Sequence, residues 1–301
     1  MNTKAMVVAA FAADALALGG HWVYNVAVIG KKYGRLDRYE NPLGRSYHPT
    51  KEKGSFTHYG DQMLLLLEEI AGTSGFDPVH FAATWRNFFL TYGGYFDKAS
   101  KTTMENIENG VAFEHSGSTS TDLAGAARIS PLVYYCHLTG SDVLSPVRLQ
   151  TAMTHNHPYI VESAAFFADV SLRVLGGQTP TTAINEIVDS NKGPEPMAEW
   201  VRRGRASRER DTREVIASFG QQCEAEAAFP GVIHLIYKYE NDLENALVEN
   251  VMAGGDSAAR GMTAGMVLGA HNGMDAIPDH WLSELKAYSR IKDLLKKIDR
   301  L

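Results

Sequence analysis

Four short polar segments, far apart along the chain, hold the side chains that could perform chemistry. They centre on Asp14, Asp61, His155 and Asp256. A carboxylate can orient or deprotonate a water molecule, and an imidazole can exchange a proton or a hydrogen bond. We expect these four segments to converge in one cleft and any chemistry to take place there.

Each of the two N-terminal acids also has a structural interpretation. Asp14 interrupts the apolar face of the first helix, where an ionised carboxylate is costly unless it is paired or hydrogen-bonded. It could lie at a solvent edge, or accept hydrogen bonds from backbone amides of a neighbouring loop. Asp61 precedes the apolar run 63–67 and could be the N-cap of that helix.

The third segment, 154–158, places His155 and His157 on either side of Asn156. These side chains could reach ribose hydroxyls or phosphate oxygens, whereas two histidines at this spacing are a weak pattern for a metal site. Alternatively, Asn156 or His157 caps the helix that is entered through Pro158, since proline favours the first helical position.

In the fourth segment, Gly254, Gly255, Asp256 and Ser257 open a helix rich in small residues. Glycines let a ligand lie against the free amides of a helix start, where phosphate and ribose oxygens bind readily. The alternative is that Asp256 is only an N-cap.

Helical periodicity dominates the sequence that must position these segments. After a first helix that ends at Gly19-Gly20, helices are predicted near 61–73, 76–92, 102–113, 124–138, 142–154, 158–175, 180–190, 194–206, 212–226, 230–239, 242–252, 257–272 and 279–299. Residues 30–54 are predicted to form a long surface loop and 116–121 a flexible polar loop. Because the sequence has no strand pair, repeat or linker, we predict one all-α domain over residues 1–301.

Composition narrows the classes of partner. Lys+Arg 29 against Asp+Glu 35 gives a net charge of -6, and acids interleave the one arginine-rich stretch, 202–213. This charge pattern argues against nucleic acid as a binding partner. The two cysteines lack CxxC spacing, which is typical of a reducing compartment. We expect a cytoplasmic protein, and the sequence leaves its oligomeric state open.

The apolar N-terminus could be mistaken for a short signal peptide. We interpret it as a buried helix, because the apolar run meets Asp14 and then resumes. No segment reaches the roughly 18 uninterrupted apolar residues of a membrane span. A membrane partner is therefore not expected.

Five motifs in order, spread over nearly the whole chain, resemble those of the ADP-ribosylglycohydrolase family. The motifs are Ala13-Asp14-Ala15-Leu16, Asp61-Gln62-Met63, the run 125–131, the run 154–158 and Gly254-Gly255-Asp256-Ser257. That family includes dinitrogenase reductase-activating glycohydrolases, ADP-ribosylarginine hydrolases and jellyfish crystallins. The resemblance implies a single large orthogonal helical bundle that cleaves the N- or O-glycosidic bond between ADP-ribose and a modified side chain, with a dinuclear magnesium or manganese centre.

The sequence departs from the family at the metal ligands. A Thr-Asp-Asp ligand run of the family falls here on His58, Tyr59 and Gly60. In the second ligand run Asp256 remains, but the next two ligand positions hold Ala258 and Ala259, and a further acidic position falls near His21. Two magnesium ions need several carboxylates. We therefore expect the dinuclear centre to be absent, with at most one weak magnesium site at Asp256.

Two features could compensate for the altered ligands. His21 and His58 could form an imidazole site for zinc or iron, with Asp61 or Asp256 as the oxygen ligand. Alternatively, Arg260, which lies four residues after Asp256 on the same helical face, could supply the missing positive charge. We favour the arginine.

The resemblance also implies roles for the site residues. Asp256, or as second candidate Asp61, would orient or activate water. His155 and His157 would contact substrate, and the turn from Gly125 to Arg128 would hold the diphosphate or ribose. The remaining expected substrate-binding residues are Asp14, His21, His58, Gly254, Gly255, Ser257 and Arg260.

The altered ligands leave three possible functions: a glycosidic-bond hydrolase acting on an ADP-ribosylated protein or a small ADP-ribose compound, a non-catalytic binder of ADP-ribose or a nucleotide, and a crystallin-like structural protein. Glu224 and Glu226 add an ambiguity, because they could belong to a solvated helix edge or face the cleft. The solvated edge is our expectation.

Overall fold

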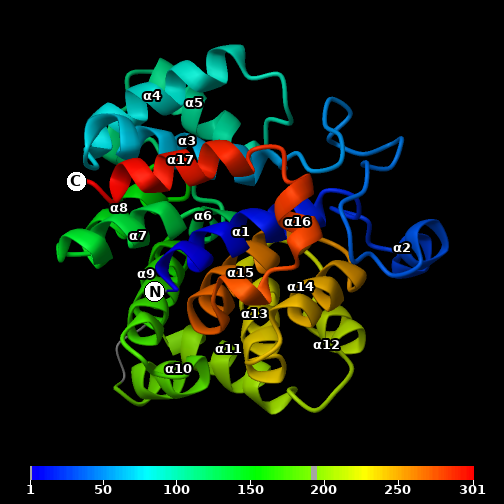
Figure 1. Cartoon of the computed structure of the whole chain (residues 1–301). Coiled ribbons are helices and arrows are strands. Elements are labelled where there is room, and N and C mark those ends of the chain that lie inside the picture. The colour runs from blue at the N-terminus through cyan, green and yellow to red at the C-terminus, as the bar shows by residue number, and fades with distance from the viewer. Residues whose placement is uncertain (1, 191–194) are drawn as a thin grey trace.

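In the computed structural model, which describes residues 2–190 and 195–301, two helices of small and apolar residues lie at the centre (Figure 1). These are α1 (Thr3–Ala17) and α15 (Ser257–Asn272). They run antiparallel, as the contacts of three glycines spaced four residues apart on α15 show. Gly261 faces Ala13, Gly265 faces Ala9 and Gly269 faces Ala5 on α1. The absence of side chains at these glycines lets the two backbones approach closely.

This close approach predicts a large difference between two glycine-to-alanine substitutions. A Cβ at Gly265 would lie 2.9 Å from the Ala9 carbonyl oxygen, whereas a Cβ at Gly72 in α3 (His58–Thr73) would meet nothing within 4 Å. We expect Gly265→Ala to lower the free energy of unfolding by roughly 1–3 kcal/mol. We expect Gly72→Ala to leave it unchanged or to raise it by up to about 1 kcal/mol. Urea unfolding of both variants tests this, and equal stabilities would contradict the packing described.

The other helices surround the central pair. They are α2 (Val26–Tyr33), α4 (Pro78–Thr91), α5 (Lys98–Glu108), α6 (Ala124–Ala127), α7 (Ser130–Thr139), α8 (Leu144–Ala152), α9 (Pro158–Leu175), α10 (Pro180–Asp189), α11 (Glu195–Ala206), α12 (Thr212–Phe219), α13 (Ala225–Lys238), α14 (Leu243–Met252), α16 (Asp279–Glu284) and α17 (Tyr288–Ile298), with 3-10 turns η1 (Phe113–His115) and η2 (Met274–Ala276). No β-strand occurs among the described residues, so the all-α prediction is confirmed. In that part of the chain no helix has the length and apolarity needed to cross a membrane.

Several predicted boundaries were wrong. Part of the predicted surface loop is the helix α2, and the predicted helix 279–299 is divided into α16 and α17. Helix α3 begins at His58 because Thr57, whose hydroxyl accepts from the Tyr59 amide, is its N-cap. The prediction that Asp61 could be that N-cap is therefore wrong.

Three isolated β-bridges join the segments that meet beside the N-termini of α3 and α15. They pair Val23 with Gly255, Ser118 with His155, and Asp122 with Glu224. The loop predicted to be flexible, 116–121, is held at one end by hydrogen bonds between Ser118 and Thr154. Backbone pairing, rather than a sheet, thus fixes the polar segments relative to one another.

Candidate active site

Two carboxylates meet at the hydroxyl group of Tyr59, in the first turn of α3. The Tyr59 hydroxyl lies 3.2 Å from Asp256 Oδ2 and 3.5 Å from Asp122 Oδ2. Tyr59 and Asp256 are buried, and the Cys223 sulfur completes a cluster with the two carboxylates in which one ligand-type atom from each residue lies within 4.8 Å of the others. An acid pair bridged by a phenol, with Asp256 buried and Asp122 partly exposed, is thus the chemical centre of this region.

The local backbone explains where these acids lie. Asp256 is the N-cap of α15 and accepts from the Ala259 amide at 3.2 Å, so the predicted alternative of an N-cap is confirmed. Asp122 accepts from the Ala124 amide at 2.9 Å at the start of α6. Each carboxylate therefore uses one oxygen to hold a helix start and directs the other toward Tyr59.

Burial disfavours negative charge in this pair. It raises the pKa of Asp122 well above its usual range, and the neighbouring Asp256 adds to the shift. Burial also raises the pKa of Asp256, against which the nearby Arg260 acts. The pair therefore resists carrying two negative charges at once.

A polar pocket of about 420 Å³ opens beside the acid pair. Its lining includes Asp122, Cys223 and Glu224, together with Asp97 at the start of α5. The remaining lining residues are Lys98, Ala99, Thr102, Ser118, Thr119, Ser120 and Thr121. Glu224 is exposed, as expected of a solvated edge, and it also lines this pocket, whereas Glu226 is exposed on α13 and does not line it.

Asp14 lies behind the start of α3. Its two oxygens accept from the Thr57 amide at 2.8 Å and from the Thr57 hydroxyl at 2.6 Å. The alternative in which Asp14 accepts from a backbone amide of a neighbouring loop is therefore confirmed. Asp14 fixes the N-cap of the helix that carries His58 and Tyr59.

Asp14 should make stability depend on pH. Burial raises its pKa from 3.8 to about 7. Between these values the folded protein binds more protons than the unfolded chain, so this carboxyl lowers the free energy of unfolding as pH rises, by about 1.4 kcal/mol per pH unit. Asp14→Asn removes this dependence and keeps an acceptor for Thr57. Urea unfolding at several pH values should show the stability of the wild type relative to Asp14→Asn falling from about pH 4 to 7; a constant difference would contradict it.

Asp61 points away from the acid pair. Its Oδ2 is bonded to Lys51 and, at 2.5 Å, to the Tyr92 hydroxyl. The four predicted residues do not form one contact cluster: Asp256 is in the acid pair, Asp14 binds Thr57, and Asp61 belongs to an ion pair with Lys51.

The third segment is joined by backbone hydrogen bonds to Ser118, which lines the pocket. His155 is buried beside Thr154, and Gly125 packs against it, since a Cβ at Gly125 would lie 2.6 Å from the His155 ring. Arg128 is 2 % exposed and donates to Gln62 and, at 2.6 Å, to the Thr154 hydroxyl. Gly125 and Arg128 thus support His155 from inside the core.

His157 has a different surrounding. It is the N-cap of α9, where its Nδ1 accepts from the Tyr159 amide at 3.2 Å, so the capping interpretation is confirmed. Its ring packs edge-on against Tyr159.

The glycine turn before α15 is filled by the protein's own backbone. Gly254 and Gly255 have φ values of 70° and 66°, and a Cβ at Gly255 would lie 2.1 Å from the Gln221 carbonyl oxygen. The Gly255 amide donates to Val23, and the Asp256 amide donates to Gln221. The expectation that free amides here would receive a ligand is therefore wrong at these two positions. Ser257, the next residue, has a buried hydroxyl group without a hydrogen-bond partner.

Arg260 lies under the same turn. It is fully buried and donates to the Gly254 carbonyl at 2.6 Å and to Asn250 Oδ1 at 3.1 Å. Its charge lowers the pKa of Asp256, although other groups take its hydrogen bonds. Arg260 therefore acts on the site in two ways: its positive charge favours the ionised form of Asp256, and its hydrogen bond to the Gly254 carbonyl fixes the backbone of the turn.

A dinuclear magnesium centre does not fit these residues. Magnesium requires hard oxygen ligands in near-octahedral geometry. At Gly60 even a Cβ would lie 2.3 Å from Asp14 Oδ2, so an acidic side chain has no room there. Ala258 and Ala259 offer no ligand atoms, and within the described residues the carboxylates that reach the Tyr59 hydroxyl group are those of Asp122 and Asp256.

Reasoning from the sequence missed Asp97, Asp122 and Cys223. The signal for Asp122 is its position just before the recognised run 125–131, and Asp97 stands just before a helix. Cys223 was considered only for redox pairing; both cysteines are free in the structure.

The fold and site together define an all-α protein with a polar pocket at helix N-termini. The sequence matches the ADP-ribosylglycohydrolase family over residues 2–301, and the chain belongs to that family.

The chain is similar to several known proteins. It is 23% identical to crystallin J1A of Tripedalia cystophora over 316 residues, covering 100% of this chain and 97% of that protein. It is 25% identical over 250 residues to an uncharacterized protein of Archaeoglobus fulgidus, covering 82% of this chain and 81% of the relative. A solved structure described as an ADP-ribosylglycohydrolase-related protein complex superposes with a TM-score of 0.74 at 18% identity, covering 99% of this chain and 97% of the other. At that identity the structure supports the fold alone.

Proposed function

We propose that this protein hydrolyses the glycosidic bond of an ADP-ribose conjugate, on a protein side chain or a small compound, without the family's magnesium pair. The observation that carries the proposal is the acid pair Asp122 and Asp256, held at Tyr59, with Asp122 on the wall of a polar pocket. Family membership supplies the substrate class.

In the proposed reaction the acid pair holds one proton, which lies on Asp256, and the ionised Asp122 orients a water molecule in the pocket and accepts its proton. The water oxygen forms a bond to the anomeric carbon, while the bond from that carbon to the leaving nitrogen or oxygen breaks. The leaving atom takes up a proton from the carboxyl group of Glu224, which lines the same pocket, and the proton that Asp122 accepted then passes to solvent while Glu224 is reprotonated. Asp256 and Tyr59 position Asp122 and do not contact the substrate.

The proposed reaction differs from the family's metal-based chemistry in the groups that offset the negative charge of the carboxylates. A magnesium pair would neutralise acids at this place; here the Tyr59 hydroxyl lies between the two carboxylates, and Arg260 lies beneath Asp256. Glycoside hydrolysis generally uses two carboxyl groups that flank the scissile bond, one as base and one as proton donor, and Asp122 and Glu224 on this pocket would take these two roles.

Ligand binding to the pocket can be tested by thermal shift with free ADP-ribose. A ligand that binds only the folded state at 100 times its Kd stabilises it by about 2.7 kcal/mol, so the melting temperature should rise, with or without magnesium. Thr119→Trp, on the exposed pocket wall, should abolish the rise. Thr139→Trp, at the exposed end of α7, should keep it. No rise in the wild type would contradict the substrate class.

A non-catalytic binder is the second candidate function. The observation in its favour is that the family's ligand positions hold His58, Tyr59, Gly60, Ala258 and Ala259. Such a protein would show the same thermal shift without releasing ADP-ribose from peptides modified on arginine or serine.

A further inference from the structure

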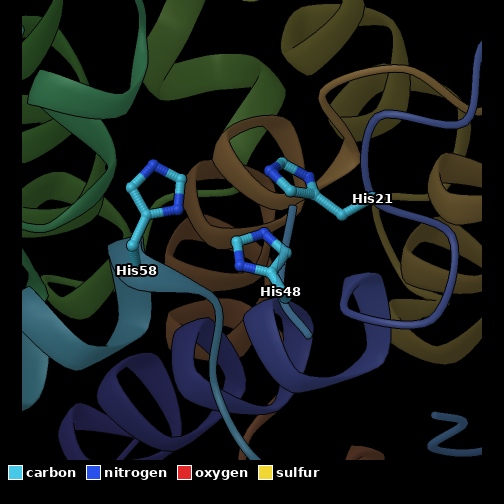
Figure 2. A group of neighbouring side chains, drawn as sticks. All are labelled: His21, His48 and His58. Carbon is cyan, nitrogen blue, oxygen red and sulfur yellow. The ribbon is translucent and has the colours of Figure 1, made fainter. Parts of the chain in front are cut away.

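Three histidines from separate parts of the N-terminal region meet in the core. His21 follows α1, His48 lies in the loop between α2 and α3, and His58 begins α3. Their exposures are 4%, 1% and 0%. Figure 2 shows the three rings turned toward a common space. None of the roles proposed above uses His48.

The spacing of the rings matches that of a metal site. One nitrogen from each ring lies within 4.8 Å of the others, and the ring centroids are 5.3, 5.5 and 6.3 Å apart. Zinc–nitrogen bonds of about 2.1 Å in tetrahedral geometry would separate such centroids by about 5 Å. Small side-chain movements would therefore bring three nitrogens to bonding distance.

The hydrogen bonding of these rings also indicates a missing ligand. Both ring nitrogens of His21 and His48, and Nδ1 of His58, are buried and have no hydrogen-bond partner; only His58 Nε2 lies within reach of one, the carboxylate of Asp97. Buried polar atoms are normally satisfied, and leaving them unpaired is unfavourable. If the three rings served only to fill the core, apolar side chains would do so without this cost.

Carboxylates lie beside two of the rings. His58 Nε2 is 3.3 Å from Asp97 Oδ2, and His21 Nδ1 is 3.7 Å from Asp256 Oδ1. Histidines that bind a metal through one nitrogen commonly present the other to a carboxylate, which fixes the ring orientation. The surroundings thus resemble the second shell of a metal site.

An aromatic side chain covers the cluster. Trp22 stacks on His21 with centroids 4.3 Å apart, and Tyr47 and Tyr95 meet it edge-on. The backbone of Trp22 has a φ of 59°, a conformation that is uncommon for a bulky residue. Strain of this kind is found where the surrounding structure holds a functional group in place.

We infer that His21, His48 and His58 together bind one divalent transition-metal ion of the zinc type. Imidazole suits such ions and does not suit magnesium. Three histidines with an open fourth position are typical of sites in which the metal also binds water or substrate. The second group of possible ligands, Asp122, Cys223 and Asp256, is the weaker candidate because its carboxylates already accept hydrogen bonds from Tyr59 and from backbone amides.

The test is the zinc content of the full chain after removal of metal by a chelator, loading with zinc and gel filtration. We expect about one zinc ion per chain in the wild type, and an affinity at least roughly 100-fold lower in His48→Ala. His115→Ala, which changes an exposed histidine, and Cys223→Ser should bind as the wild type does. Absence of zinc from the loaded wild type would overturn the inference, as would loss of zinc in Cys223→Ser with retention in His48→Ala.

Cobalt provides a readout that does not depend on the folding of a variant. Cobalt(II) added to the metal-free wild type should give visible absorption bands of a nitrogen-ligated ion without a thiolate-to-cobalt charge-transfer band. A strong thiolate band would place the metal at Cys223 and overturn the inference. Metal binding is measured here without any assay of hydrolysis. A failure of the metal site can therefore be distinguished from a failure of the proposed function.

Discussion

Asp122→Asn should lower the rate of ADP-ribose release by at least about 100-fold, the usual effect of removing a general base. The amide cannot take a proton from water. It is isosteric with the carboxyl group and keeps an oxygen that can accept from the Ala124 amide, so α6 should still form. The measurement is the release of free ADP-ribose from ADP-ribosyl-arginine and ADP-ribosyl-serine peptides under saturating substrate.

The matched control for this variant is Glu226→Gln, an acid on α13 that is exposed and does not line the pocket. It should hydrolyse at the wild-type rate. The thermal shift with ADP-ribose should persist in Asp122→Asn, because the substitution removes a proton acceptor and leaves the pocket shape intact. If Asp122→Asn hydrolysed as fast as the control, its role as the base would be wrong.

Arg260→Met should lower the free energy of unfolding more than Gly265→Ala does. The substitution leaves the buried Gly254 carbonyl and Asn250 amide oxygen without their donor, and each such atom costs about 1–3 kcal/mol. The free energy of unfolding should therefore fall by roughly 2–6 kcal/mol. Burial already lowers the pKa of Arg260 to about 10, as expected for a charge held inside the core by hydrogen bonds.

Arg148→Met is the appropriate comparison for this variant. Arg148 is paired with Glu162 in a partly exposed ion pair, and pairs of that kind contribute about 0–1 kcal/mol. Urea unfolding of both variants gives the two values. Equal losses would mean that Arg260 does not hold the glycine turn in the way the structure indicates.

Periodicity and ordered motifs made the family and the helical fold predictable. The segments around His155 and Asp256 were found from their residue types, and the departure at His58, Tyr59 and Gly60 was visible once the motifs were aligned. The influence of Arg260 on Asp256 could be anticipated because residues four apart share a helix face. Its bonds to Gly254 and Asn250 could not, since the turn is defined only in three dimensions.

The site residues that could not be predicted from the sequence lie mainly on irregular segments. His48 lies in a long loop without periodicity, and the sequence indicates a turn there but not the direction of the ring. Asp122 ends a polar loop whose position depends on backbone pairing with Glu224. The start of α3 was predicted too late because Asp61 has the residue type of an N-cap. The N-cap is Thr57, which is held in place by a hydrogen bond to Asp14, 43 residues earlier in the chain.

Magnesium dependence of hydrolysis tests the central claim most directly. Protein purified without magnesium would be assayed on the ADP-ribosylated peptide that it cleaves, with magnesium added from none to a large excess. The account predicts a rate that does not change with magnesium, because Gly60, Ala258 and Ala259 cannot hold the ion pair. A rate that appears only with magnesium and saturates as it is added would contradict it.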